Sequence, residues 1–245
     1  KFDEIYNLAC PASPKKYQKN PLDTIKTNIF GSINLLELAK KNNAKIFQAS
    51  TSEVYGDPLI HPQDESYRGN VNIIGVRACY DEGKRLAESI FFDYYRTHKI
   101  NIKIARIFNT YGPNMNNDDG RVVSNFILSA LKGNPLIIHG NGKQTRSFCY
   151  VSDTVRGLVK LMNSKMAIQG PINIGSDNEI TIYNLAKKII KLTNSKSKIV
   201  NVEKAEDDPI KRKPNLYLAK KLLNWNRQVK LENGLQKTID YFKNK

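Results

Sequence analysis

The feature that most constrains the fold of this chain is a regular alternation of short apolar stretches with longer, helix-patterned segments. Apolar stretches bounded by turn residues are typical of buried strands, and apolar residues three and four apart are typical of helices that cover a sheet. The pattern predicts strands at 2–9, 45–50, 102–107, 136–139, 172–175 and 199–202. It predicts helices at 21–39, 79–99, 122–131, 153–163, 182–193, 216–223 and 232–242. Such alternation indicates an α/β fold, a Rossmann-like doubly wound parallel sheet with helices on both faces.

One element of a complete nucleotide-binding fold is absent from the sequence. Such folds place a glycine-rich turn between the first strand and the first helix, where the helix N-terminus binds a pyrophosphate. The chain has no G-x-G-x-x-G, and its close glycine pair, Gly140 and Gly142, follows a late strand. The chain also begins with Lys1 rather than Met. We therefore expect a fragment from which the N-terminal strands are missing.

Composition narrows the class of protein. Hydrophobic residues make up 40% of the 245 residues, which excludes a disordered chain. The formal net charge is +16, but the basic residues are spread and no basic block is interleaved with aromatic residues, so we expect no nucleic-acid partner. No apolar stretch approaches the ~18 residues of a transmembrane helix, so no membrane partner is expected either. The three cysteines are far apart and the three histidines lack ligand spacing, which favours a reducing, cytoplasmic location and no metal site.

Tyr80 and Lys84 form the first candidate for chemistry. Four residues apart on a predicted helix, they lie on one face. A free tyrosine has a pKa near ~10, and a nearby ammonium favours the phenolate, so the pair predicts a general base with a lowered pKa. Y-x-x-x-K also occurs by chance as an ordinary surface pair.

A second candidate stands at the end of the strand at 45–50, where Ser50, Thr51, Ser52 and Glu53 follow one another. Strand ends in such sheets face the ligand crevice, so these hydroxyls and this carboxylate can meet the tyrosine. A strand-terminating turn with capping hydroxyls is the alternative.

Seven segments together resemble the extended short-chain dehydrogenase/reductase family, and within it the UDP-glucuronate decarboxylases. They are Asn7–Pro14, Ser50–Pro58, Cys79–Arg85, Ala105–Pro113, Asp119–Phe126, Gly142–Phe148 and Asp207–Pro214. They follow one another in the family's order across almost the whole chain. The resemblance implies an NAD-dependent enzyme that oxidises a UDP-sugar acid at C4, decarboxylates it and reduces C4 again.

The resemblance also implies the roles of individual residues. Tyr80 would be the base acting on the sugar 4-hydroxyl, and Lys84 would lower its pKa and hold the nicotinamide ribose. Thr51 would form a hydrogen bond with the same hydroxyl, and Ser52 and Glu53 would surround the sugar ring near C5. Arg212 would face the sugar carboxylate or help to reprotonate the intermediate. The catalytic set is Thr51, Ser52, Glu53, Tyr80, Lys84 and Arg212.

Binding residues and domains follow from the same resemblance. The NAD pocket would be lined by Leu8, Ala9, Cys10, Thr27, Ala49 and Ser50, with Tyr80 and Lys84. The UDP-sugar would be held by Tyr17, Asn109, Arg121, Lys143, Gln144 and Arg146. Residues 1–110 would form a partial NAD-binding domain with the catalytic helix. Residues 111–245 would form mainly a smaller α/β UDP-sugar-binding domain, interwoven with the first.

Several alternatives stay open. A dTDP-glucose 4,6-dehydratase carries an Asp-Glu pair after the threonine, whereas Thr51 is followed by Ser52 and Glu53. A UDP-sugar 4-epimerase usually lacks an arginine in a setting such as D-D-P-I-K-R-K-P. A relative that oxidises and decarboxylates the same sugar acid but releases the 4-keto product is harder to distinguish from a decarboxylase that reduces C4 again. A non-catalytic, basic nucleic-acid- or polysaccharide-binding module is the alternative of another class. The resemblance further implies a homodimer whose interface is a four-helix bundle built from 25–38 and 79–95.

Overall fold

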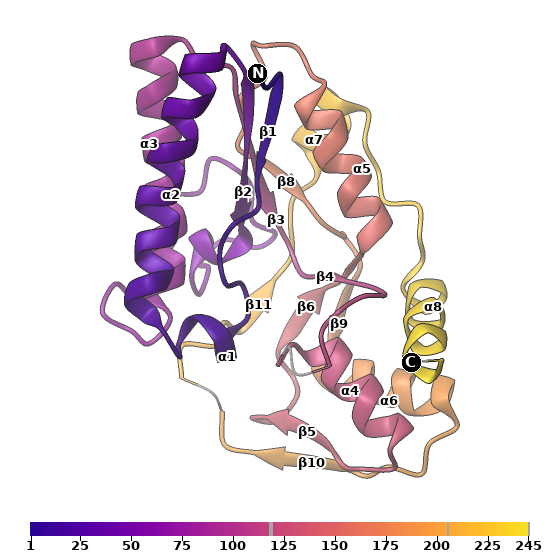
Figure 1. Cartoon of the computed structure of the whole chain (residues 1–245). Coiled ribbons are helices and arrows are strands. Elements are labelled where there is room, and N and C mark those ends of the chain that lie inside the picture. The colour runs from indigo at the N-terminus through magenta and orange to yellow at the C-terminus, as the bar shows by residue number, and fades with distance from the viewer. Residues whose placement is uncertain (118–119, 205, 245) are drawn as a thin grey trace.

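The computed structural model describes residues 1–117, 120–204 and 206–244. Its centre is a parallel four-stranded sheet in the order β1-β2-β3-β8 (Figure 1). These strands are β1 (Glu4–Asn7), β2 (Lys45–Thr51), β3 (Ile102–Ile107) and β8 (Ile172–Ile174). All three pairings are parallel. Parallel strands need crossover connections, and helices supply them here.

Helices cover both faces of this sheet, which confirms the predicted α/β class. α2 (Pro21–Asn42) and α3 (Ala78–His98) lie on one face, and α5 (Val151–Met162) and α7 (Tyr217–Leu223) on the other (Figure 1). Successive residues of a strand point to opposite faces. On β2, accordingly, Ile46 packs under α2 and α3 with Leu36 and Phe91. The next residue, Phe47, packs on the other face with Leu161 and Trp225. The sheet is therefore buried on both sides, as a doubly wound sheet requires.

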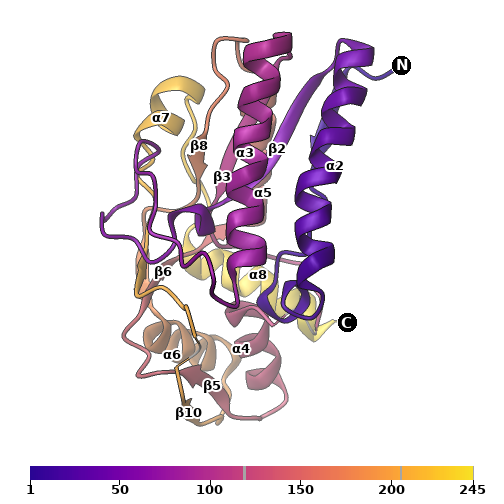
Figure 2. The same cartoon turned by 90° about the vertical axis from the view of Figure 1, so that its left-hand side faces the viewer.

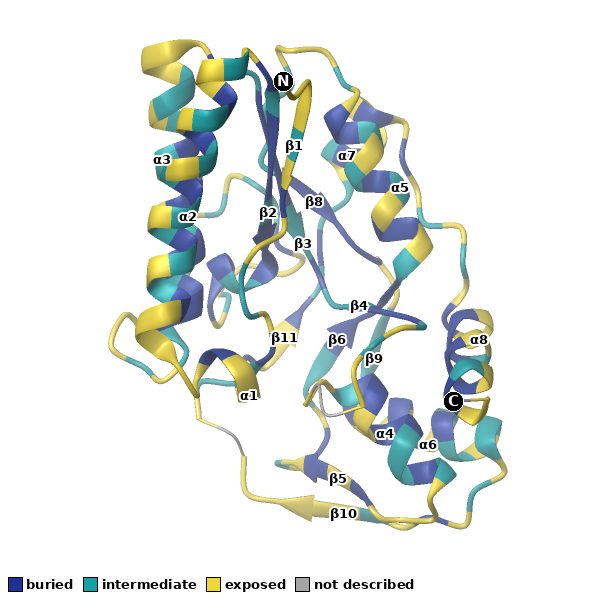
Figure 3. Ribbon diagram, in the orientation of Figure 1, coloured by how far each residue is buried: buried dark blue, intermediate teal, exposed yellow. Residues whose placement is uncertain are grey.

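A second group of elements lies below the sheet in Figure 1. It contains α4 (Val122–Leu131), α6 (Ile182–Thr193) and α8 (Leu231–Lys243), together with the parallel pair β5 (Leu136–His139) and β10 (Ile199–Val202). Their buried apolar side chains form a separate core (Figure 3). The second half of the chain contributes to both regions, since α5, β8 and α7 pack around the first sheet.

The predicted strands and helices are all present, with small shifts at their ends. The first strand, predicted at 2–9, is shorter by two residues at each end, with Leu8 and Ala9 leaving the sheet, and the helix predicted at 21–39 extends to Asn42. Within the described part of the chain, seven short elements were not predicted by the pattern. They are α1 (Pro14–Tyr17), the 3-10 helix η1 (Ser52–Tyr55), β4 (Thr110–Tyr111), β6 (Thr145–Ser147), β7 (Cys149–Tyr150), β9 (Glu179–Thr181) and β11 (Lys211–Arg212). Two to four residues are too few to show a period, and tertiary pairing such as β11 with β6 creates these strands.

Two further observations complete the description. Among the described residues, no helix is long and apolar enough to cross a membrane. Asp119, the first residue of the predicted segment Asp119–Phe126, lies outside the described residues.

Candidate active site

A cavity of about 1040 Å³ opens between the carboxyl ends of the central strands and the second group of elements. Strand ends β1, β2 and β3 contribute Leu8, Ser50 and Phe108 to its lining, and the opposite wall includes Val122 and Ile138. The lining contains fourteen of the residues that the sequence predicts for the site: Leu8, Cys10, Tyr17, Ala49, Ser50, Thr51, Ser52, Glu53, Tyr80, Lys84, Asn109, Arg121, Gln144 and Arg146. The crevice beyond the strand ends is therefore the candidate site, as expected for an open parallel sheet.

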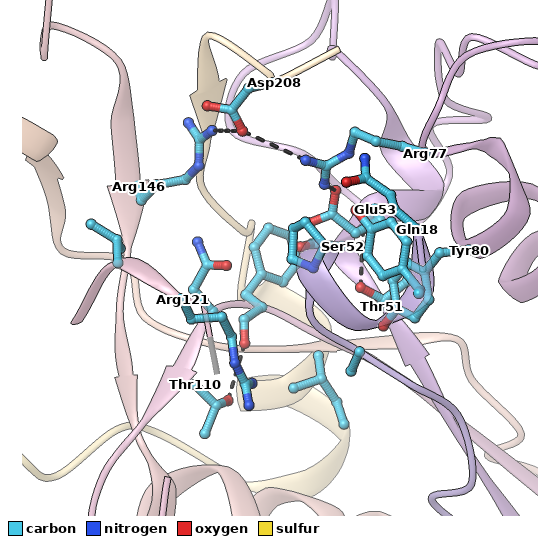
Figure 4. Close-up of a pocket in the computed structure, with 18 of the residues that line it drawn as sticks. Gln18, Thr51, Ser52, Glu53, Arg77, Tyr80, Thr110, Arg121, Arg146 and Asp208 are labelled. Carbon is cyan, nitrogen blue, oxygen red and sulfur yellow. Dashed lines mark hydrogen bonds and ion pairs between the residues drawn. The ribbon is translucent and has the colours of Figure 1, made fainter. Parts of the chain in front are cut away.

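Tyr80 occupies a defined place in this cavity. α3 begins at Ala78, so its first turn directs Tyr80 toward the end of β2, where the tyrosine hydroxyl and Thr51 are hydrogen-bonded (Figure 4). Tyr17 stacks on the Tyr80 ring, with centroids 4.9 Å apart and planes 6° from parallel. Lys84, one turn later, donates from Nζ to the Ala49 carbonyl at 2.8 Å and lies 5.8 Å from the Tyr80 ring centroid. The base predicted from the sequence is thus held on three sides.

The pKa of Tyr80 differs from the sequence-based prediction. Burial raises it above the ordinary value of tyrosine, and the hydrogen bond with Thr51 acts in the opposite direction. Burial also lowers the pKa of Lys84. The lowered Tyr80 pKa that the sequence predicts is therefore wrong as the net direction in this structure, because removal of the tyrosine from water outweighs the hydrogen bond with Thr51.

Glu53 is the centre of a charged cluster beside Tyr80. Its carboxylate accepts hydrogen bonds from Arg77 on one side and Arg212 on the other. Burial alone would raise the pKa of Glu53, but the two guanidinium groups lower it to about 2. Arg212 also donates to the Gly56 carbonyl at 2.9 Å. Glu53 is therefore an ionised, rigidly held carboxylate at the cavity wall.

Asp208 extends this cluster across the cavity. Its carboxylate accepts from Arg146 at 2.9 Å and lies 3.7 Å from the Arg77 guanidinium (Figure 4). At the inner end of the cluster, burial and the Glu53 carboxylate raise the pKa of Asp81 to about 7. Arg77 and Arg146 face the cavity from opposite sides, so an anion that replaced Asp208 between them would meet two guanidinium groups.

Four expected site residues are not in the cavity lining. The Ala9 N–H donates a hydrogen bond to Asn7 Oδ1, and the Thr27 hydroxyl donates one to the Asp23 carbonyl within α2. Lys143 is exposed in the turn after β5. Arg212 is 2% exposed and lies behind Glu53. Its guanidinium reaches the cavity only through that carboxylate.

Arg77, Asp208 and Gln18 line the cavity and were missed by sequence reasoning. A signal for Arg77 was available, since it stands three residues before Tyr80 and four before Asp81, on the same side of the helix start. Asp208 lies inside the D-D-P-I-K-R-K-P segment, but its contact with Arg146 joins residues 62 apart in sequence. Local spacing cannot predict such a contact.

The chain is similar to several known proteins. A family model described as GDP-mannose 4,6 dehydratase matches residues 1–238. UDP-glucuronic acid decarboxylase 3 of Arabidopsis thaliana is 60% identical over 233 residues, which cover 95% of this chain and 68% of the relative. UDP-glucuronic acid decarboxylase 1 of Xenopus tropicalis is 53% identical over 241 residues, 98% of this chain and 57% of the relative. The chain thus spans between half and about two thirds of these proteins.

Solved structures show the same fold. UDP-glucose 4-epimerase of Thermotoga maritima, solved with UDP-glucose, has a TM-score of 0.92 at 28% identity, covering 99% of this chain and 77% of that one. UDP-glucuronic acid 4-epimerase of Bacillus cereus, solved with UDP-glucuronic acid and NAD, has a TM-score of 0.90 at 28% identity, covering 99% and 76%. The family match over nearly the whole chain, the 60% identity and the Tyr80–Lys84 site agree. This chain belongs to the extended short-chain dehydrogenase/reductase family, in the group of the UDP-glucuronic acid decarboxylases.

Proposed function

We propose that this chain carries the catalytic and sugar-binding part of an enzyme that converts UDP-glucuronate to UDP-xylose with NAD. The observation that carries the proposal is the meeting of two groups in one cavity. Tyr80 and Thr51 form a hydroxyl-binding pair, and Glu53 and Arg77 form a charged pair beside it. The first pair suits oxidation of an alcohol, and the second suits a sugar that carries a carboxylate.

The residues of one side of the cavity fit the nicotinamide half of NAD. Leu8 and Cys10 follow β1, and Ala49 and Ser50 end β2, so a flat ring can lie across the strand ends. Among the described residues, the buried Lys84 ammonium donates one hydrogen bond, to the Ala49 carbonyl, which leaves donors for ribose hydroxyls. When bound, NAD accepts hydride from C4 and later returns it, and its positive ring favours the Tyr80 phenolate.

Tyr80 performs the proton transfers at the sugar 4-hydroxyl in this proposal. Thr51 holds the O4 atom while the Tyr80 oxygen takes its proton and hydride leaves C4. The resulting C4 ketone is β to the C6 carboxylate, so the C5–C6 bond electrons move into the C4–C5 enolate and carbon dioxide leaves. C5 then takes up a proton supplied by solvent, C4 would take its hydride back from the reduced nicotinamide, and Tyr80 returns its proton to O4.

The charged cluster positions the acid group for this reaction. Arg77 lines the cavity beside Glu53 and can bind the C6 carboxylate until it leaves as carbon dioxide. Glu53, whose pKa is about 2, stays ionised and places a fixed negative charge near the reacting carboxylate. Arg146 and Arg121 line the far side of the cavity, where guanidinium groups suit a pyrophosphate.

Product analysis tests the proposal. The protein expressed from its complete reading frame is incubated with UDP-glucuronate and NAD, and products are identified by mass spectrometry and proton NMR. We expect UDP-xylose and carbon dioxide, and a loss of at least about 100-fold in kcat for Tyr80→Phe, because proton transfer contributes about 10²–10⁴. A UDP-4-keto-pentose would mean that C4 is not reduced. A product that retains C6 would contradict decarboxylation and favour a 4-epimerase.

We also propose a homodimer through the outer faces of α2 and α3. The two helices lie side by side on the outside of the molecule (Figure 2). Leu22 and Phe30 of α2 and Leu86 of α3 are exposed there, at 69%, 60% and 45%. Exposed apolar residues gathered on paired helices are typical of an interface.

The cysteines Cys10, Cys79 and Cys149 are free, which suits the reducing environment of a cytoplasmic location.

A further inference from the structure

Glu88 lies on the cavity-facing side of α3 but has no place in the reaction described above. It follows Tyr80 by eight residues and Lys84 by four, so the three side chains share one face of the helix. Glu88 is 8% exposed. Its carboxylate accepts a hydrogen bond from Ser50 Oγ at 2.5 Å. An ionisable group so close to two cavity residues needs a physical account.

Arg106 on β3 holds the Glu88 carboxylate in place. Arg106 donates from Nε to Oε1 at 3.0 Å and from Nη2 to Oε2 at 2.8 Å, a bidentate pair. The same guanidinium donates to the Tyr55 hydroxyl at 3.1 Å, which donates in turn to Asn173 of β8 at 2.8 Å. The carboxylate is therefore fixed by groups from three elements and cannot rotate away from Ser50.

This fixed carboxylate sets the hydrogen-bonding character of Ser50. A serine hydroxyl has one hydrogen to donate, and here the hydrogen is directed to Glu88. The Ser50 oxygen then has only its lone pairs for the cavity, so it can accept from a ligand N–H or O–H but cannot donate. With a glutamine at position 88, an amide donor could face Ser50 and reverse this character.

Glu88 also acts on the charge of Lys84. Burial lowers the pKa of Lys84, while Cys10 and the Glu88 carboxylate act against that change. The other titratable group facing Lys84 is Tyr80 on the same helix, and Arg106 lies behind Glu88 on β3. Glu88 lies one helical turn from Lys84, so its carboxylate is placed to favour the protonated form of the buried amine.

We propose that Glu88 is a positioning residue of the cofactor-binding side, which holds Ser50 as a hydrogen-bond acceptor and Lys84 as a cation, with Arg106 fixing its carboxylate. The proposal rests on the proposed function for the identity of the ligand, a nicotinamide ribose. It concerns only residues of this chain, and it distinguishes Glu88 from an ordinary buried ion pair that joins α3 to β3.

The test measures the protonation of Lys84 directly. The protein is labelled across a pH series with a small amine-acylating reagent, and modification of Lys84 is quantified by mass spectrometry. We expect Glu88→Gln to lower the midpoint of Lys84 labelling by roughly one pH unit, the size of effect typical of a nearby charge. Glu82→Gln is the matched control, because it changes the same group on the same helix at a half-buried position that pairs with Arg85. It should leave the midpoint unchanged.

Activity adds a second readout. In Glu88→Gln, the alkaline limb of the pH profile of kcat/KM and the KM for NAD should both change. Glu88→Asp keeps the charge, so its alkaline limb should match that of the wild type. If Glu88→Gln does not fold, the double variant Glu88→Gln with Arg106→Gln removes both members of the buried ion pair, so that the Arg106 guanidinium is not left unpaired. The double variant should still lower the midpoint of Lys84 labelling, because Glu88 is the member of this ion pair that raises the Lys84 pKa.

The outcomes separate this inference from the proposed function. A folded Glu88→Gln protein with a lower melting temperature and an unchanged Lys84 midpoint would overturn the inference and leave an ion pair that only stabilises the fold. A wild-type enzyme that makes no UDP-xylose, together with a lowered Lys84 midpoint in Glu88→Gln, would contradict the proposed function but support the role of Glu88.

Discussion

Individual side chains of this site are governed by burial as much as by their neighbours. Glu53 and Asp81 lie in one cluster, yet their pKa values move in opposite directions, to about 2 and about 7. Glu53 accepts from two guanidinium groups, whereas burial and the Glu53 charge dominate at Asp81. The same functional group, a carboxyl, therefore serves as a fixed anion in one place and as a proton-holding group in the other.

The low pKa of Glu53 predicts a pH dependence of stability. A carboxyl whose folded pKa is about 2 and whose ordinary value is 4.5 stabilises the fold fully above pH 4.5, and this stability is lost as the pH falls toward 2. Glu53→Gln should therefore lower the free energy of unfolding by about 3 kcal/mol at pH 7 and weaken its fall between pH 4.5 and 3. Urea unfolding across this range measures both effects. The exposed Glu37→Gln should leave the slope unchanged, and an equal slope in Glu53→Gln would contradict the prediction.

Lys103 shows the same physics away from the site. It is fully buried under the turn after α5, and its ammonium donates to the carbonyls of Ser164, Lys165 and Ile168 at 3.2, 2.7 and 2.8 Å. Lys103→Met would leave these carbonyls without that donor, so we expect a loss of about 2 kcal/mol in the free energy of unfolding. Lys45→Met, at a half-buried surface pair with Glu4, should cost less than about 1 kcal/mol. Equal losses would show that the Lys103 bonds contribute little.

At the scale of elements, the spacing of α2 and α3 decides where Tyr80 lies. Gly83 faces α2, and a Cβ at this position would lie 2.9 Å from the Asn28 side-chain nitrogen. Asn28 in turn donates to the Cys10 sulfur at 3.2 Å, at the cavity wall. A glycine inside a helix is usually unfavourable, so its presence here is explained by this close approach.

Two glycine substitutions test this packing. Gly83→Ala should lower the melting temperature, because Asn28 must move and α2 and α3 must separate slightly. Gly31→Ala, in α2 with nothing within 4 Å of the new Cβ, should raise the free energy of unfolding by up to about 1 kcal/mol. Fluorescence of the buried Trp225, the single tryptophan of the chain, follows both transitions. A gain of stability in Gly83→Ala would contradict the close contact, and a loss in Gly31→Ala would indicate that another chain covers that face of α2.

At the scale of the whole molecule, the cavity lies between two regions that each have a core of their own. On the side of the central sheet, α3 and η1 supply Tyr80 and Glu53, and on the other side the start of α4 and β6 supply Arg121 and Arg146. Because α5, β8 and α7 return to the central sheet, the two regions are joined several times by the chain. The position of the arginines relative to the tyrosine is therefore set by packing over the whole molecule.

The proposed homodimer gives a prediction at this scale. Phe30→Asp places a charge on the exposed face of α2 and should convert the protein from dimer to monomer in size-exclusion chromatography with light scattering. Phe2→Asp is the matched control, since Phe2 is 53% exposed just before β1 and outside that face. A wild-type monomer at micromolar concentration, or a dimer that persists in Phe30→Asp, would contradict an α2–α3 interface.

The sequence by itself determined the class of fold and the centre of the site. Hydrophobic periodicity is a local property, so segments such as 122–131 and 182–193 were predicted with the bounds that the structure has. Tyr80 and Lys84 are one helical turn apart, and Thr51 ends a strand, so these positions also follow from short-range rules. Short elements such as β11 did not follow, because they exist only through pairing with a distant strand.

Only the tertiary structure decided how the charges are arranged and which way the pKa values move. The contact between Arg212 and Glu53 joins residues 159 apart in sequence, and it leaves Arg77 rather than Arg212 in the cavity lining. Burial of Tyr80, which raises its pKa, depends on the packing of several segments around it. Desolvation and long-range pairing are properties of the packed molecule, so the residue types were present in the sequence while their electrostatic state was not.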